Sequence, residues 1–353
     1  MKNIFNKKGT GAEIDIRPPS EQIKDYDFRE VVASVNKVDW YEKPEKDWRS
    51  FPIFDQNGSG SCVAQTLAKM LGIMYWLIHG VYVHFSATHI YQRRSNKPNG
   101  GMIGVEAFEI VRKGGATLEV LVPSQKMTDR QMDSVDIHEY KKRVGEIFKI
   151  GNHIGTPVKD IDLIASIIQT TKKPIMTWCW ASYSEWDRDV PIIKDENLTL
   201  YTAPVRHSIT VVDFTLYKGK KALIIEDSWG AKRGKAGRRI ITEDFFEKRN
   251  WFNRYFMNFV FNDEVIEIPS HKFSKKMYFG ENNDEIKALQ DFLKALGLFP
   301  TNIGSTGFYG AITAKAVYNF QVKYKVADMG ELNALQGRIV GDKTLSALNK
   351  IKI

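Results

Sequence analysis

The sequence predicts an α+β fold, with a large domain of two lobes and a small helical module at the C-terminal end. Two observations predict the large domain. Apolar residues recur at helical spacing between residues 62 and 173, and β-branched and aromatic residues alternate between residues 174 and 262. A third observation, three short helical patterns punctuated by glycine after residue 277, predicts the module. With 353 residues, 43% of them hydrophobic, the chain can bury two separate cores.

The first lobe is expected to contain three amphipathic helices. The first follows Cys62 and ends at Gly80. The segment "GVEAFEIVRKGG" (104–115) predicts a second helix closed by a Gly-Gly stop, and "KDIDLIASIIQTTKK" (159–173) predicts a third. The core-facing residues of the first helix are Val63, Leu67, Met70, Leu71 and Met74.

The second lobe is expected to be an antiparallel sheet. "PIMTWCW" (174–180) is typical of a buried strand, and 207–230 indicates two strands joined by a Lys-Gly-Lys turn. "GRRIITEDFF" (237–246) and "NRYFMNFVF" (253–261) add further strand pattern. Helices first and strands later favour a helical lobe packed against a twisted sheet.

Composition limits the classes of function. The net charge of +9 favours anionic partners such as cell-wall polymers or membrane surfaces, while no sequence motif supports a nucleic-acid partner. The sequence contains no run of about 18 consecutive apolar residues, so no transmembrane helix is expected. The N-terminus lacks the apolar core of a signal peptide. Two cysteines and no metal-ligand spacing favour a reduced, cytoplasmically made protein without metal or cofactor, and a monomer is expected.

Cys62 stands at the start of the first helix, behind a loop of Gln, Asn, Gly and Ser. A helix N-terminus and a nearby imidazolium are the usual means of lowering a thiol pKa. The small residues of the loop should let a substrate carbonyl approach, and Gln56 could donate to an oxyanion together with the backbone N–H of Cys62. The alternative is that Cys62 is a buried filler, which is the expected role of Cys179 in its apolar strand.

His207 differs from the other histidines because it opens a strand whose hairpin partner ends at Asp227. In a hairpin the start of the first strand lies near the end of the second, so the two side chains are expected to meet. Asp227 could then orient the imidazole toward Cys62, as a nucleophile–base–orienter array requires. Trp229 is expected to shield this pair from water.

From about residue 46 to 250 the sequence resembles papain-like cysteine peptidases. The resemblance rests on "DWR" (47–49), the spacing from Gln56 to "GSCVA" (60–64), "HSITVVDF" (207–214) and "EDSWG" (226–230). It implies a two-lobe peptidase with Cys62, His207, Asp227 and Gln56 as catalytic residues. "NGG" at Asn99, Gly100 and Gly101 is similar to the family's substrate-cleft glycines, although a simple turn is the alternative.

Three positions depart from the family pattern. Asp227 stands where papain-like enzymes usually have asparagine, Val63 replaces an aromatic residue, and Ser59 replaces a disulfide cysteine. A carboxylate can still orient the histidine, but it stabilises the imidazolium more strongly than an amide does. The missing disulfide fits a reducing compartment.

Residues 277–353 resemble the three-helix peptidoglycan-binding domain of many cell-wall hydrolases. The resemblance rests on Leu-Gln with Leu-Gly, on Thr-Gly-Phe-x-Gly-x-x-Thr with Phe-Gln, and on Val-Gly-Asp-x-Thr-Leu. Most of these residues have scaffold roles, and Phe308, Tyr309 and Gln321 are predicted as ligand contacts. The expected core is formed by Leu289, Leu293, Leu296, Ala316, Val317, Phe320, Leu345 and Leu348.

The resulting prediction is an N-terminal arm (1–45), a papain-like peptidase domain (46–262), a linker (263–276) and a peptidoglycan-binding-like domain (277–353). The arm is expected to be a structural strap and not an inhibitory pro-segment. One hypothesis is a hydrolase of peptidoglycan, similar to a bacteriophage endolysin, made in the cytoplasm and acting later at the cell wall. The alternative is a protease of protein substrates whose small domain serves for docking. An intact Cys-His-Asp set disfavours a third, non-catalytic interpretation.

Overall fold

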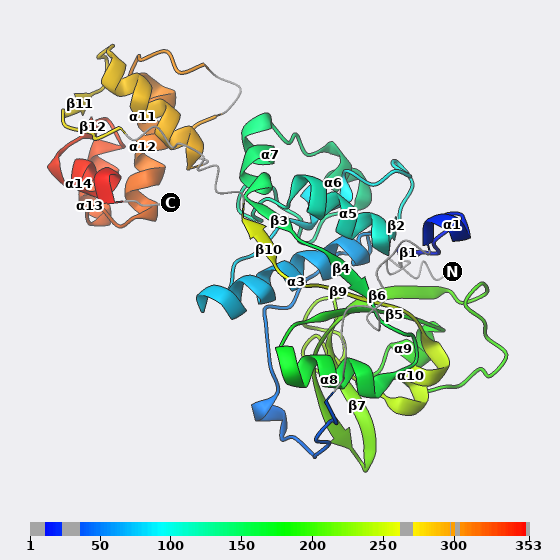
Figure 1. Cartoon of the computed structure of the whole chain (residues 1–353). Helices are drawn as coiled ribbons and strands as arrows, with labels where there is room; N and C mark the ends of the chain where they lie inside the picture. The colour runs from blue at the N-terminus through cyan, green and yellow to red at the C-terminus, as the bar shows by residue number, and fades with distance from the viewer. Residues whose placement is uncertain (1–10, 23–35, 262–270, 297, 301–303, 351–353) are drawn as a thin grey trace, which may run out of the picture. The chain divides into compact units, whose positions relative to one another are not determined.

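The computed structural model describes residues 11–22, 36–261, 271–296, 298–300 and 304–350. The chain forms two units, Met1–Asp263 and Glu264–Ile353, which are drawn in Figure 1. The predicted arm and linker are described in part, since residues 1–10, 23–35 and 262–270 lie outside the described ranges. Among the described residues, no helix has the length and apolar character needed to cross a bilayer.

The helical lobe of the first unit is built around one buried helix, α3. This helix is buried from Cys62 to Met74, and Gly80 ends it in the left-handed conformation, with φ of 72°. The predicted first helix is therefore confirmed as α3, and the predicted second helix is confirmed as α5. The helices of this lobe are α3 (Cys62–His79), α4 (Ala87–Tyr91), α5 (Gly104–Gly114), α6 (Asp129–Ser134) and α7 (Glu139–Glu146).

The sheet lobe contains a six-stranded antiparallel sheet in the order β4-β9-β5-β6-β7-β8. Helix α3 packs against β6, which places the start of this helix beside the sheet. The strands are β4 (His153–Gly155), β5 (Ile175–Ala181), β6 (Val205–Tyr217), β7 (Lys220–Glu226), β8 (Arg238–Thr242) and β9 (Asn250–Phe256). A separate pair is formed by β3 (Phe148–Ile150) and β10 (Phe259–Phe261).

Three helices accompany the sheet: α8 (Ile161–Thr171), α9 (Tyr183–Trp186) and α10 (Glu243–Arg249). The first of them was predicted as a helix, but it packs against β6 and β7 of the sheet and does not belong to the helical lobe. The strand pattern read through 237–246 is wrong in its second half, because α10 starts at Glu243. Its two acidic residues at the N-terminus favour a helix there, and Phe245 and Phe246 fill the core from one face of it.

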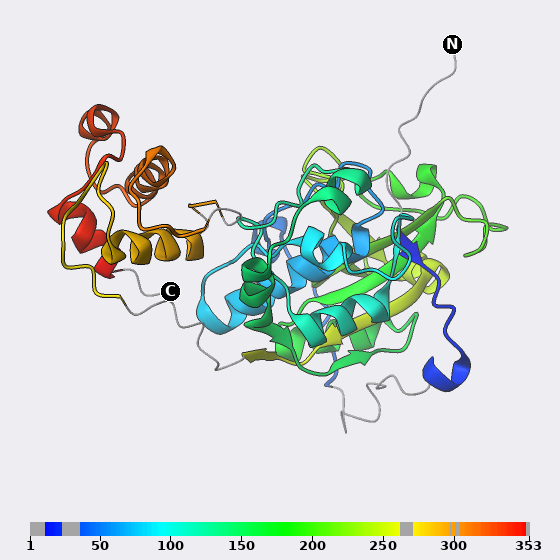
Figure 2. The same cartoon turned by 90° about the horizontal axis from the view of Figure 1, so that it is seen from above.

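The described parts of the N-terminal arm run along the first unit. Strand β1 (Ala12–Glu13) pairs in parallel with β2 (Met102–Ile103), and Figure 2 shows this dark blue segment beside the loop before α5. A short helix, α1 (Pro19–Gln22), follows. Further on, the Trp40 indole N–H donates to Asp162 at 2.8 Å, and the Lys43 ammonium lies 2.6 Å from Asp213. A 3-10 turn, η1 (Glu45–Asp47), leads into the peptidase domain.

The second unit contains, in its described part, four helices and one pair of short strands. The helices are α11 (Asp284–Ala295), α12 (Ala311–Lys323), α13 (Met329–Leu335) and α14 (Asp342–Lys350), and β11 (Met277–Tyr278) pairs with β12 (Ile339–Val340). The three predicted helices are present as α11, α12 and α14. A further helix, α13, was not predicted, and its N-cap Asp328 accepts from the Glu331 N–H. The expected core is found: its eight residues are buried in, or packed against, one cluster.

Part of the predicted linker belongs to this second unit. Phe273 is buried in its core, and its backbone N–H and carbonyl both bond the Asn349 side chain. Residues 271–276 are therefore part of the folded C-terminal domain.

Candidate active site

Cys62 is the first residue of α3, and its loop is held by a set of buried polar contacts. The Gln56 amide donates to the Ser59 carbonyl at 2.5 Å and accepts from the Ser228 hydroxyl at 2.5 Å. The Gln56 backbone N–H donates to the Ser228 carbonyl at 2.8 Å. The loop before the cysteine is thus fixed to the segment after β7, and the Gln56 amide is held near the start of the helix.

His207 and Asp227 meet as the hairpin arrangement predicted. The Nε2 atom of His207 lies 2.7 Å from Oδ1 of Asp227, and both side chains are buried. Burial of the ring disfavours its charge, but Asp227 and the Cys62 side chain outweigh this and raise the pKa of His207 to about 9. For Asp227, burial is likewise outweighed by His207 and Arg239, which lower its pKa. An imidazolium beside the thiol at neutral pH follows from this geometry.

Arg239 is a residue of this site that the sequence analysis missed. Its Nε donates to Oδ2 of Asp227 at 2.9 Å, and the side chain is fully buried. Both carboxylate oxygens of Asp227 therefore accept a hydrogen bond, one from His207 and one from Arg239. The sequence shows two adjacent arginines in "GRRII", but which of them reaches Asp227 depends on how β8 pairs with β7.

Two indole rings surround the His207 imidazole. Trp229, itself 9% exposed, lies over the ring with centroids 4.9 Å apart, and Trp186 meets it edge-on at 5.7 Å. The position of Trp229 agrees with its predicted shielding role, and Trp186 was not foreseen. Rings on two sides keep water away from the His207–Asp227 pair.

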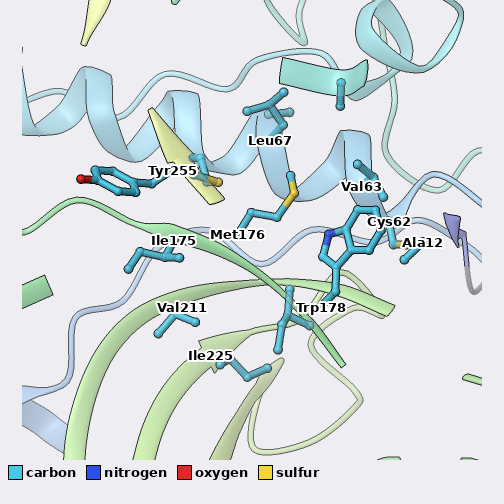
Figure 3. Packing of buried hydrophobic residues seen from close by; sticks show 14 of the residues in the cluster. Ala12, Cys62, Val63, Leu67, Ile175, Met176, Trp178, Val211, Ile225 and Tyr255 are labelled. Atoms are coloured by element: carbon cyan, nitrogen blue, oxygen red, sulfur yellow. The ribbon is translucent and has the colours of Figure 1, made fainter. Parts of the chain in front are cut away.

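The N-terminal arm covers Cys62. The Gly11 N–H points at Sγ at 3.3 Å, while the Gly11 carbonyl accepts from the Met102 N–H at 2.7 Å. Ala12 is 1% exposed and lies next to Cys62, as Figure 3 shows. The thiol is therefore fully buried, although the loop was predicted to keep it reachable, and the expectation that the arm is only a strap is corrected by this placement.

The arm does not lie on Cys62 as a substrate would. A substrate presents a carbonyl carbon to the sulfur, whereas Gly11 presents its N–H and uses its carbonyl to bond β2. A β-carbon on Gly11 would lie 1.7 Å from the Gly60 carbonyl oxygen, so only glycine fits at this close approach.

The "NGG" segment lies partly at the cleft. Gly101, with φ of 88°, donates to the Tyr91 hydroxyl at 3.0 Å, and the Glu13 side chain of the arm lies against it. Gly100 and Asn99 are exposed, and the Asn99 carbonyl accepts from Arg94 at 2.8 Å. Of the three predicted residues, the structure thus places Gly101 beside the arm and the other two in the preceding turn.

Two of the predicted contacts in the C-terminal domain are structural residues. Tyr309 is fully buried and its hydroxyl donates to the Gly337 carbonyl, while the buried Gln321 amide donates to Ile339 and Thr344. Their prediction as ligand contacts is wrong, because neither side chain reaches the surface. Phe308 is 48% exposed.

Cys179 is buried in β5, and burial raises the pKa of its thiol. Among the described residues, no group of three or more His, Cys, Asp or Glu side chains could hold a metal ion.

Comparison with known proteins identifies the family. Residues 35–246, more than half of the chain, match the family described as "Papain family cysteine protease". The chain belongs to the papain family of cysteine proteases. Residues 282–334 match a second family, "Putative peptidoglycan binding domain".

Individual relatives agree with this assignment. A cathepsin L-like proteinase of Phaedon cochleariae is 26% identical over 204 residues, covering 54% of this chain, and the chain spans 57% of that relative's length. Two solved structures share the fold. Xylellain, a cysteine protease from Xylella fastidiosa, has a TM-score of 0.58 at 18% identity over 71% of this chain and 97% of its own. Digestive procathepsin L2 proteinase from Tenebrio molitor has a TM-score of 0.57 at 15% sequence identity. The match covers 73% of this chain and 81% of that protein.

Proposed function

We propose that this papain-family protease hydrolyses peptide or amide bonds in bacterial peptidoglycan. The observation that carries the proposal is the presence, in one chain, of a cysteine peptidase domain and a domain matching a peptidoglycan-binding family. The net charge of +9 supports attraction to an anionic cell envelope. We further propose that the protein acts at the bacterial cell wall as an endolysin does, either after its release from the cytoplasm or from a virion.

The geometry supports a thiolate–imidazolium mechanism in which Cys62 attacks the scissile carbonyl carbon. The imidazolium of His207 gives its proton to the leaving amine as the C–N bond breaks, which leaves an acyl-enzyme. Water, deprotonated by the same ring, then releases the acid and restores the thiolate. The Cys62 backbone N–H and the Gln56 amide are the proposed oxyanion donors, and Asp227 holds the ring with Nε2 engaged.

The C-terminal domain has a groove that is a better candidate for binding the proposed polymer than the residues predicted from the sequence, two of which are buried. It has a volume of about 550 Å³ and offers aromatic, amide and cationic groups together. Phe279 lies 4.8 Å from the Arg338 guanidinium, and the Tyr318 hydroxyl donates to Asn333 at 2.7 Å. Rings can stack on sugars, and Lys315 and Arg338 can bind stem-peptide carboxylates.

Fragments released from the substrate test the proposal. Purified peptidoglycan and a mixture of unfolded proteins are incubated separately with the protein, and the products are identified by mass spectrometry. New amino and carboxyl ends in the stem peptides or cross-bridges, absent with Cys62→Ala and retained with Cys179→Ala, are expected. Cleavage of the proteins alone would instead support the second candidate, a protease of protein substrates, which the cathepsin L-like relative favours.

Binding of the C-terminal domain is tested with two exposed phenylalanines. Phe279, 43% exposed, lines the groove, and Phe308, 48% exposed, does not. Phe279→Ala is expected to weaken sedimentation with insoluble peptidoglycan about tenfold, since loss of a stacked ring costs about 1 kcal/mol or more. Phe308→Ala should bind as the wild type does. Equal loss in both variants would contradict the assignment of the groove.

A further inference from the structure

We propose that the pocket at the arm end of the cleft selects substrates by a carboxylate group, with Arg254 as the specificity-determining residue. This inference rests on the proposed peptidase function and adds the substrate class. The carboxylate can belong to a Glu or Asp side chain of a protein or to the stem peptide of peptidoglycan.

The pocket has a volume of about 430 Å³ and lies where the arm leaves Cys62. Its walls come from the start of α5, the end of β4, and β5 and β9. Its lining includes Gly104 and Trp178, and the arm contributes Glu13, Ile14 and Asp15. A substrate that displaces the arm from Cys62 would therefore expose this pocket to its own neighbouring side chains.

Arg254 supplies positive charge at the pocket wall. It is 4% exposed, and its Nη1 lies 2.6 Å from Nδ1 of His153, which must accept this hydrogen bond. The other ring nitrogen of His153 then donates to Glu109 at 2.9 Å. These contacts hold the guanidinium in place, so that little side-chain freedom is lost when an anion binds beside it.

One further donor belongs to a residue of the same pocket. The Thr156 hydroxyl is buried and has no hydrogen-bond partner within the described part of the chain. Buried donors without acceptors are costly, and a carboxylate can accept from several donors at once. A fixed cation and a buried hydroxyl in one pocket make a suitable site for such a group.

The arm itself supports the charge preference. Its two carboxylates, Glu13 and Asp15, belong to residues that line the pocket. Burial of Asp15 opposes its ionisation, but the hydrogen bonds of Arg17 and the charge of Arg254 lower its pKa. A negative group next to this pocket is therefore stabilised in the structure.

The test is a positional library of fluorogenic tetrapeptides, followed by matched single peptides with Glu, Gln, Leu or Arg at the selected position. The full-length chain and its Gly11→Ala variant are both used, so that the arm does not mask the cleft. We expect kcat/KM for Glu to exceed that for Gln by about 10- to 100-fold, as for a hydrogen bond to a charged group. A synthetic stem peptide, with and without its free carboxylate, distinguishes the two sources of the group.

Variants assign the preference to the pocket. Arg254→Met should reduce the Glu/Gln ratio to near one, Arg254→Lys should restore part of it, and Thr156→Val should lower it without removing a charge. Lys173→Met is the control, because it removes a half-buried cation that binds the Met257 carbonyl and does not line the pocket. Active-site thiol titration corrects each rate for the folded fraction.

The outcomes are distinguishable. Cleavage without preference for Glu over Gln, or a preference that Arg254→Met retains, overturns the inference and leaves the peptidase function intact. If Arg254→Met does not fold, the inference is judged from the Glu/Gln ratio of kcat/KM in the wild type and from its decrease in Thr156→Val. Failure to cleave any peptide, together with an unreactive Cys62, overturns the proposed function and the inference together.

Discussion

Replacing Gly11 by alanine is expected to raise kcat/KM of the full-length chain for small peptides by about 10- to 100-fold. The added β-carbon would lie 1.7 Å from the Gly60 carbonyl oxygen and 2.4 Å from its carbon, both backbone atoms, so the arm must move. A steric conflict of this kind costs at least about 1–3 kcal/mol, and each 1.4 kcal/mol shifts the arm equilibrium tenfold. Unseating the arm also removes the Gly11 N–H from Sγ, which frees the thiol for reaction.

Alkylation of Cys62 by iodoacetamide provides a second measurement of the same displacement. Its rate should rise with kcat/KM in Gly11→Ala, and Cys179 should stay unlabelled because it is buried in β5. Gly304→Ala is the matched control, since a β-carbon there meets nothing within 4 Å. Equal alkylation rates in the wild type and Gly11→Ala would mean that the arm does not restrict access.

Asp227→Asn is expected to lower kcat/KM by about 100-fold and the free energy of unfolding by about 3 kcal/mol. The reason is local to this chain. Asp227 accepts from His207 with one oxygen and from Arg239 with the other. An amide has one oxygen, so its NH2 group would face one of these two donors, and the buried Arg239 would keep only the more distant carboxylate of Asp187, 4.0 Å away, as a counter-charge. The measurements are steady-state kinetics and urea denaturation.

A double variant separates this explanation from a general loss of stability. Arg239→Gln in the Asp227→Asn background removes the weakly compensated cation and should restore part of the unfolding free energy, so the two effects are not additive. Strictly additive losses would contradict the proposed coupling of Arg239 to the orienting residue.

The pH dependence gives a further check on Asp227. The pKa of His207 is raised from 6.5 to about 9, so the stability that its protonated form contributes is fully present below pH 6.5 and is lost as the pH rises toward 9. Asp227→Asn removes the main cause of the rise. Its pH-dependent loss of stability, measured by urea denaturation, should therefore lie lower in pH and be smaller than in the wild type.

The sequence predicted those parts of the fold that have periodic or local signals. Helix α3 was predicted because its apolar residues repeat at helical spacing and Gly80 ends it. His207 and Asp227 were predicted to meet because a hairpin brings its two ends together. In contrast, α10 was read as strand because "ITEDFF" combines β-branched and aromatic residues, and its helical state depends on the core that receives Phe245 and Phe246.

Other features of the site have no local signal. Arg239 reaches Asp227 through the pairing of β8 with β7, which the sequence leaves open. Strand β1 is two residues long, too short for any periodicity to mark, and its place on Cys62 depends on an exact fit at Gly11. Tyr309 and Gln321 belong to a sequence motif, but the motif preserves packing in the small domain and not a binding surface.

The anchoring of the arm has a consequence for when the enzyme would work. Beyond the part that covers the thiol, the same arm is fixed by Trp40 to α8 and by Lys43 to β6. A displaced arm consequently remains attached and competes with every incoming substrate as an intramolecular ligand. Dilute peptides in solution would lose this competition, whereas a polymer held by the same chain would win it. Under the proposed function, we therefore expect the protease to be less active in solution than on a peptidoglycan surface that its C-terminal domain binds.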